Sequence, residues 1–185
     1  MKRTVYGQGF RLGEYPTKVN RKHLPQYAYW KRMLERCYKN DLPAYREVHC
    51  SEEWHCYENF YNDVSNMVGF GNIGWNLDKD MLFEGNKFYS KNTCVLLPPS
   101  LNTFITHKAQ SNTNLPIGVD FHVKTGKYRV RGCSGKHLGL FDDPVEASIL
   151  YKHDKCKTAD NLSYFWEGKV DDRVINVLRN FIERV

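Results

Sequence analysis

The sequence has no long run of apolar residues. No stretch approaches the roughly 18 apolar residues that a membrane-spanning helix needs, so we expect no membrane partner. The segment at the amino terminus is basic, but it has no apolar core of the kind found in secretory signals. These two absences predict an intracellular, cytoplasmic protein.

The sequence also lacks the paired cysteines of common zinc modules. None of its six cysteines forms a Cys-x-x-Cys pair. His49 with Cys50 and His55 with Cys56 are candidates for zinc, but the two cysteines are further apart than the usual spacing of about two to four residues. We therefore expect no zinc, and thiols that pack as small apolar side chains. The glycine-rich residues 69–74 lack a following Lys-Ser/Thr pair, which excludes a phosphate-binding loop of that type.

The chain does have positive charge and ample apolar material. Of its 185 residues, 41% are hydrophobic and 26% are charged, which suits one or two small globular domains. Lys and Arg number 27 against 21 Asp and Glu, giving a net charge of +6. Such an excess favours a polyanionic partner.

The first part of the chain predicts helices and basic surface. Residues 1–22 are basic and glycine-containing, and they predict irregular backbone with one short hairpin, either solvated or in contact with phosphates. Residues 24–40 have apolar side chains at helical spacing. The other face of that helix carries Arg32 and Arg36, which either contact phosphates or are only solvated. Ser51 is predicted to cap a second helix.

Residues 76–104 organise the first half of the chain. The charged residues 78–80 follow a short apolar segment, and residues 84–87 supply the glycine and asparagine of a tight turn. Residues 94–97 are an apolar strand, which two prolines end before a further helix. The predicted order is strand, loop, strand and helix, with polar groups gathered at one end.

This pattern resembles the ββα-metal core of HNH-type endonucleases, in the divergent form found in phage-encoded proteins. The resemblance implies that Asp78 and Asn102 hold a divalent metal, and that Asn92 braces the loop. Oxygen ligands suit Mg²⁺, or Mn²⁺ in its place. Lys79 stands where the family has its His base, so proton transfer is left to Lys79 or to Asp80. The alternative is a solvated ion cluster on a fold that has lost nuclease activity.

Residues 115–161 predict a second folded region after the polar residues 107–116. Residues 118–123 and 127–131 each alternate between apolar and polar side chains, and a third strand follows at residues 137–141. Asp142 or Asp143 would then cap a helix that has Pro144 in its first turn. We expect a three-stranded antiparallel sheet with one face on the helix and the other displaying Lys and Arg.

This region resembles the APETALA/ethylene-response-factor type of DNA-binding domain. The matching motifs are Gly118-Val119 and residues 126–131, 138–142 and 144–147. In that family the sheet lies in the major groove, where Arg can bind guanine and Lys suits phosphates. The base preference does not transfer, because Asp120 and His137 replace the Arg and Trp that the family usually has. The residues that would meet double-stranded DNA are His122, Lys124, Lys127, Arg129, Arg131, Lys136 and His137.

The two resemblances together predict an α+β protein, with an HNH-like ββα domain at residues 1–108. Residues 109–185 would be the APETALA-like domain, with a terminal helix over residues 169–185. The implied function is a sequence-specific, metal-dependent endonuclease for double-stranded DNA, of the homing-like phage kind, acting in the cytoplasm of the host cell. The alternative is a non-catalytic DNA-binding regulator that keeps the HNH-like fold. A third hypothesis is a module whose basic face binds an acidic protein. The sequence leaves monomer and dimer open.

Overall fold

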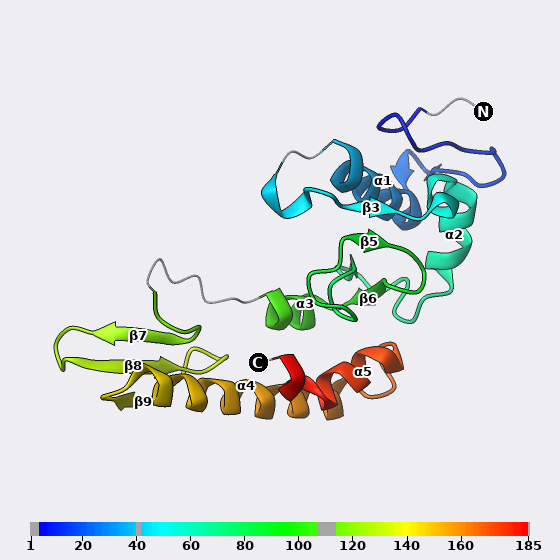
Figure 1. Ribbon diagram of the computed structural model, residues 1–185. Coiled ribbons are helices and arrows are strands. Elements are labelled where there is room, and N and C mark those ends of the chain that lie inside the picture. Colours follow the sequence, from blue (N-terminus) through cyan, green and yellow to red (C-terminus); the bar gives the residue numbers. More distant parts are fainter. Residues whose placement is uncertain (1–3, 40–41, 107–113, 185) are drawn as a thin grey trace. The chain divides into compact units, whose positions relative to one another are not determined.

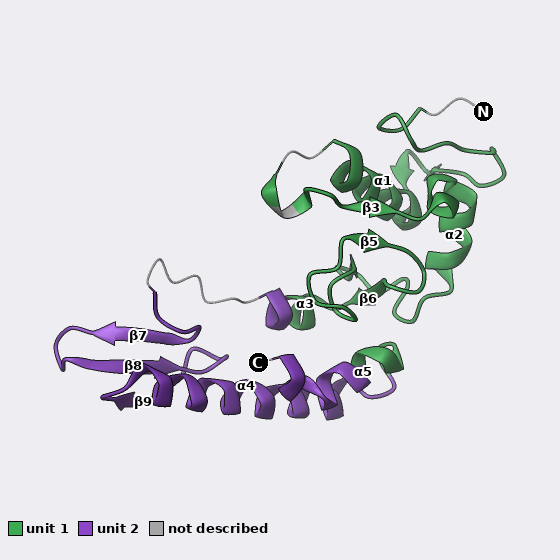
Figure 2. Cartoon of the chain, viewed as in Figure 1, with its two compact units in different colours: residues 1–102, 169–174 green, residues 103–168, 175–185 purple. Residues whose placement is uncertain are grey.

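The computed structural model describes residues 4–39, 42–106 and 114–184, and it is a mixture of helices and small sheets (Figure 1). The predicted α+β class is confirmed. The chain divides into two compact units (Figure 2), of which unit 1 is residues 1–102 and 169–174 and unit 2 is residues 103–168 and 175–185. The expected domain boundary after residue 108 lies outside the described residues. Among the described residues, no helix is both long enough and apolar enough to cross a membrane.

Helix α1 (Pro25–Tyr38) is the centre of the unit 1 core. Pro25 occupies its first turn, where the missing N–H costs nothing. The predicted apolar stripe is confirmed, because Trp30, Met33 and Leu34 are almost fully buried. The Trp30 indole nitrogen donates to the Trp54 carbonyl at 2.7 Å, which ties the helix to the segment that precedes α2.

Helix α2 (Tyr57–Ser65) begins later than the sequence predicts. The residues after Ser51 first form a short 3₁₀ helix, η2 (Glu52–His55), and the Ser51 side chain makes no capping bond. The reason is tertiary packing: Trp54 is buried edge-on against Phe60, with ring centroids 4.9 Å apart, and this fixes the earlier turn. Another 3₁₀ helix, η1 (Pro43–Tyr45), follows α1.

The strands of unit 1 are short. β1 (Lys18–Val19) and β2 (Lys22–His23) form the predicted hairpin in the basic amino-terminal region. β3 (His49–Cys50) runs parallel to β5 (Phe88–Tyr89), a pairing that the sequence did not suggest.

The two strands and the helix predicted in residues 76–104 are found in that order, but the short strand β5 interrupts the predicted loop between them. β4 (Asn76–Asp78) pairs antiparallel with β6 (Val95–Leu97), and Asp78 lies opposite Val95. All three residues of β6 are buried, which agrees with its apolar sequence. Helix α3 (Pro99–Thr106) starts two residues after β6 ends. This arrangement places residues 78–80 at the start of the long loop between the two strands.

Unit 2 contains the predicted three-stranded antiparallel sheet. Its strands are β7 (Val119–His122), β8 (Lys127–Arg131) and β9 (His137–Phe141), with β8 in the middle and a bulge near its end. One face of the sheet packs on helix α4 (Pro144–Trp166) through a small core of Val119, Val130, Ala147 and Tyr151.

Two local features fix the position of the sheet on α4. Asp143 caps the helix, because its carboxylate accepts the Val145 backbone N–H at 3.0 Å. Gly118 has a φ of +79°, and a Cβ there would lie 2.1 Å from the Tyr151 ring, so only glycine fits. The predicted terminal helix is shorter than expected: α5 covers Asp172–Arg179, and the 3₁₀ helix η3 (Phe181–Arg184) follows it.

Candidate functional site

Asp78 ends β4 and opens the loop that contains the predicted metal and proton-transfer residues. Its Oδ1 atom accepts backbone N–H groups from Asp80, at 2.9 Å, and from Met81, at 2.6 Å. Burial raises the pKa of the Asp78 carboxyl above its ordinary value, and the nearby Asp80 charge adds to that rise, although the two backbone donors oppose it. The two hydrogen bonds therefore fix the orientation of the carboxylate, while burial and the Asp80 charge make its ionised form less favourable.

Lys79 is a buried cation and not part of a solvated cluster, which corrects the alternative expectation for residues 78–80. Only 7% of the residue is exposed. Its Nζ donates to both carboxylate oxygens of Asp80 at 2.8 Å and to the Asn86 carbonyl oxygen. An ammonium has three N–H donors and no acceptor, so all of its hydrogen-bonding capacity is used. In this arrangement Lys79 holds the loop together and has no lone pair with which to accept a proton.

Asn86 bonds to both ends of its loop segment, whereas the HNH resemblance implies that Asn92 has the bracing role. The Asn86 amide nitrogen donates to the Lys79 carbonyl at 2.9 Å and to the Phe88 carbonyl at 2.7 Å, while its Oδ1 accepts the Phe88 N–H at 3.0 Å. The sequence marked Asn86 only as a turn residue, and its one signal was the position beside Gly85. Asn92 is exposed, and its backbone carbonyl accepts a bond from Arg173 at 2.9 Å.

The oxygen ligands expected for a divalent metal come from two elements. Asp78 is on β4, and the half-buried Asn102 is on α3, where its backbone N–H bonds to the Pro98 carbonyl at 3.1 Å. Within the described residues no three His, Cys, Asp or Glu side chains converge as a metal-binding group. The donors present suit Mg²⁺ in chemistry, because Mg²⁺ commonly takes one or two carboxylates and fills its other positions with water and phosphate oxygens.

The residues considered for zinc are engaged in other contacts. The Tyr38 hydroxyl lies 2.6 Å from the His55 Nε2 and 3.5 Å from the Cys50 sulfur. The Cys56 thiol donates to Glu58 at 3.4 Å, and the Glu58 carboxylate also accepts the backbone N–H groups of Leu12 and Gly13. These contacts join the amino-terminal region and the end of α1 to the segment around α2.

The outer face of the unit 2 sheet carries an arginine pair organised by Asp120. Asp120 lies directly across from Arg129, and its carboxylate accepts Nε–H of Arg129 at 3.2 Å and a second bond from Nη2. The Nε of Arg131 lies 3.9 Å from the same carboxylate, and 55% of the Arg131 side chain is exposed. The hydrogen bond from Arg129, helped by both positive charges, lowers the pKa of Asp120.

The other predicted DNA-binding residues surround this pair. His122 and Lys127 lie opposite each other across β7 and β8, and the exposed His137 lies opposite Arg131. Lys127 also pairs with Asp142 at 3.0 Å. Lys124 and Lys136 are exposed in the two turns that join the strands. The structure thus brings the predicted residues to one face and its turns.

Sequence reasoning noted Asp120 only as a departure from a family motif. The strand register would have given its role, because residues 120 and 129 are directly opposed once the turn is placed at residues 123–126. Asp120 is therefore a missed member of the site.

Comparisons of the chain with protein-family models, with curated proteins and with solved structures found no match. The resemblances noted in the sequence depend on their motifs alone. The functional proposal accordingly depends on the geometry of the loop and of the sheet.

Proposed function

We propose that this chain is a sequence-specific binding protein for double-stranded DNA, and that unit 2 reads the DNA through its sheet. The observation that carries the proposal is the Asp120–Arg129 pair on the face of the sheet opposite α4. The pair holds a guanidinium in a fixed plane on an exposed strand surface. A fixed planar fork is what recognition of a base edge requires.

The free donors of Arg129 match the edge of a guanine. Arginine has five N–H donors, and Asp120 takes one from Nε and one from Nη2. Two parallel N–H groups remain on the Nη1–Nη2 edge, where they can donate to O6 and N7 of guanine in the major groove. Arg131, which is more exposed, supplies a second such fork beside it.

The surroundings of the pair suit the phosphate backbone. The outer face and its turns carry five cationic side chains against two carboxylates, which belong to Asp120 and Asp142. Lys124 and Lys136 lie in the turns, and Lys127 is the first residue of β8. Flexible edge lysines contribute salt-dependent contacts to phosphates, while the central arginines supply discrimination between bases.

Duplex binding measured by fluorescence anisotropy over a range of NaCl concentrations tests the sheet. We expect Arg129→Ala/Arg131→Ala to lose most of its affinity and to show a smaller salt dependence. The matched control is Lys152→Ala/Lys157→Ala, which removes the same charge from exposed positions on α4. Equal binding by the two double variants would reject the sheet as the DNA-binding surface.

For unit 1 we infer a Mg²⁺-dependent HNH-type nuclease that cuts the bound DNA. The support is the succession β4, loop, β6 and α3, with Asp78 at the end of the first strand and Asn102 on the helix. Asp78 and Asn102 would hold the metal, which when bound supplies positive charge for a developing phosphoryl oxyanion and lowers the pKa of water. Asp78 is oriented by two backbone donors, and Asn86 and Lys79 keep the loop closed.

One specific observation favours a second candidate, a DNA-binding protein without catalysis. Lys79 stands in the position of the family's base, and its Nζ donates hydrogen bonds to both Asp80 carboxylate oxygens and to the Asn86 carbonyl. Asp80 in turn accepts from Lys79 through both oxygens. Proton transfer by either residue therefore requires this ion pair to open.

A plasmid-nicking assay with Mg²⁺ or Mn²⁺ separates the two candidates. A nuclease predicts nicking by the wild type that Asp78→Ala abolishes, with duplex binding kept. Lys79→Met tests the proton-transfer role, and binding without nicking by the wild type would favour the second candidate. Cutting that persists in Asp78→Ala would reject the metal site.

A further inference from the structure

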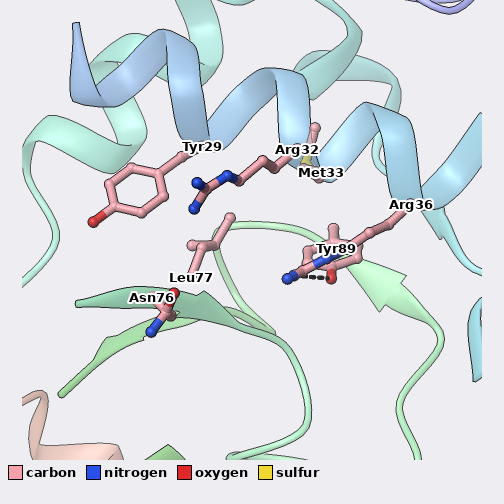
Figure 3. Close-up of a pocket in the computed structure, with 7 residues that line it drawn as sticks. All are labelled: Tyr29, Arg32, Met33, Arg36, Asn76, Leu77 and Tyr89. Atoms are coloured by element: carbon pink, nitrogen blue, oxygen red, sulfur yellow. Dashed lines mark hydrogen bonds between the residues drawn. The ribbon is translucent and has the colours of Figure 1, made fainter. Parts of the chain in front are cut away.

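A small groove in unit 1 lies between α1 and the strands β4 and β5 (Figure 3). Its floor is apolar and buried, formed by Met33, Leu77 and Tyr89. Its rim is made entirely of polar side chains, namely Tyr29, Arg32, Arg36 and Asn76. Four of these seven lining residues come from α1, at the i, i+3, i+4 and i+7 positions that form one stripe of a helix.

The two arginines of the rim supply positive charge to the groove. Neither forms an ion pair in the described part of the chain. Arg36 is anchored: its Nη1 donates to the Tyr89 hydroxyl at 3.2 Å, and its guanidinium lies 5.6 Å from the centre of the Tyr45 ring. Arg32 is exposed, and in Figure 3 its guanidinium extends into the space between Tyr29 and Leu77.

Both arginines line the groove, and the charge of Arg36 interacts with that of Asp78, the candidate metal ligand. Burial raises the pKa of Tyr29, and the charge of Arg32 opposes that rise, so the guanidinium lies close to the phenol. Burial lowers the pKa of Arg36, but Tyr89, Tyr45 and Asp78 outweigh it and the pKa lies above its usual value. Arg36 and Asp78 therefore interact electrostatically. In the chain, Asp78 directly follows Asn76 and Leu77, the two residues of β4 that line the groove.

The size of the groove decides what it can hold. The cavity is about 20 Å³, which accommodates roughly one water-sized group. A nucleobase or a sugar ring is too large, whereas a single non-bridging phosphate oxygen fits. Arg32 and Arg36 both line the groove, and each guanidinium can donate N–H groups to a phosphate oxygen placed there.

We propose that this groove is a phosphate subsite, which holds one phosphodiester of a nucleic-acid strand between Arg32 and Arg36, beside Asp78. The subsite adds a second contact to the DNA-binding function proposed above. It rests on that function, because the phosphate is taken to be part of DNA. It gives unit 1 its own contact with the strand, independent of the sheet in unit 2. A bound phosphodiester would also supply the phosphate oxygen that a Mg²⁺ ion held by Asp78 requires.

The test uses the full chain with Arg32→Gln, and Lys31→Gln as its control. Both residues are exposed neighbours on α1 and both changes remove one charge, but only Arg32 lines the groove. Affinity for a 20-base-pair duplex is measured by fluorescence anisotropy against NaCl concentration. We expect Arg32→Gln to weaken binding about fivefold at 0.15 M salt, and to lower the slope of log K against log salt by about one. Lys31→Gln should change the affinity less than twofold.

The outcomes separate the subsite from the sheet. If Arg129→Ala/Arg131→Ala loses duplex binding while Arg32→Gln behaves like Lys31→Gln, the subsite is wrong and the sheet stands. If only Arg32→Gln loses binding, the subsite stands and the sheet is wrong. A titration with inorganic phosphate, followed by the NMR signals of arginine side chains, identifies the source. A shift at Arg32 without any effect of Arg32→Gln on duplex binding would mean a site for free phosphate, and would overturn the proposal.

Discussion

Each unit contains a carboxylate paired with a cation, and the two pairs differ in what they leave free. In unit 1, Lys79 is buried, and all three of its N–H groups donate hydrogen bonds, to Asp80 and to the Asn86 carbonyl. In unit 2, Asp120 and Arg129 are partly exposed, and three N–H donors of the guanidinium have no partner among the residues that the structure describes. An ion pair whose hydrogen-bond donors are all used can only stabilise its own loop. An ion pair with unused donors can also bind a ligand.

We expect the largest change in stability from substitution of Lys79. Lys79→Ala should lower the free energy of unfolding by about 2–3 kcal/mol, because it leaves the Asp80 carboxylate and the Asn86 carbonyl without their buried donor. Urea unfolding measures the change, and the exposed Lys91→Ala in the same unit is the control. A loss as small as that of the control would show that the pair does not hold the loop.

Asn86→Ala should have the next largest effect and lower the free energy of unfolding by about 2 kcal/mol. It removes three side-chain hydrogen bonds, one across the loop to the Lys79 carbonyl and two to the backbone of Phe88. The exposed Asn72→Ala controls for the change in residue type. If Asn92→Ala proved more costly than Asn86→Ala, the loop would be braced as the sequence motif implied and not as the structure has it.

Asp78→Asn should keep or raise the free energy of unfolding at pH 7. The amide oxygen can still accept the two backbone bonds, while the buried charge is removed. Because the folded pKa of Asp78 is raised, the wild type gains stability as pH falls through that pKa, and its difference from the variant should shrink. Unfolding curves at pH 7 and pH 4 check the sign. A wild type that is clearly the more stable at pH 7 would contradict it.

Asp120→Asn should change stability least, because surface ion pairs contribute little. The lowered pKa of Asp120 means that any contribution is present at neutral pH and is lost as pH falls through the folded pKa. Its effect on DNA should have two parts: weaker discrimination between sequences, since Arg129 loses its brace, and tighter binding to nonspecific duplex, since a negative charge is gone. If the variant discriminated between DNA sequences as well as the wild type does, Asp120 would not be needed to orient Arg129.

The elements with strong local signals could be predicted from the sequence. Alternation gave the strands of unit 2, and helical spacing with Pro25 gave α1 to within a few residues. The start of α2 could not be predicted, because the burial of Trp54 overrides the capping preference of Ser51. The pairing of β3 with β5 joins segments nearly 40 residues apart, and no local pattern encodes it.

The roles assigned to the candidate site residues stay predictions, whereas their places in the fold can be compared with the sequence motifs. The motif located residues 78–80 and the outer strand residues, which the structure places on one loop and on one sheet face. It did not reveal that Lys79 is buried, that Asn86 spans the loop or that Asp120 holds Arg129. These facts depend on register and on contacts across loops, which a linear motif does not contain.

The most direct test of the central claim is selection of duplexes from a random-sequence library by the full chain and by Arg129→Lys. We predict that the wild type enriches a defined, guanine-containing sequence. We also predict that Arg129→Lys, which keeps the charge but loses the planar fork, binds duplex without that preference. Enrichment of the same sequence by both proteins, or of no sequence by the wild type, would contradict the claim.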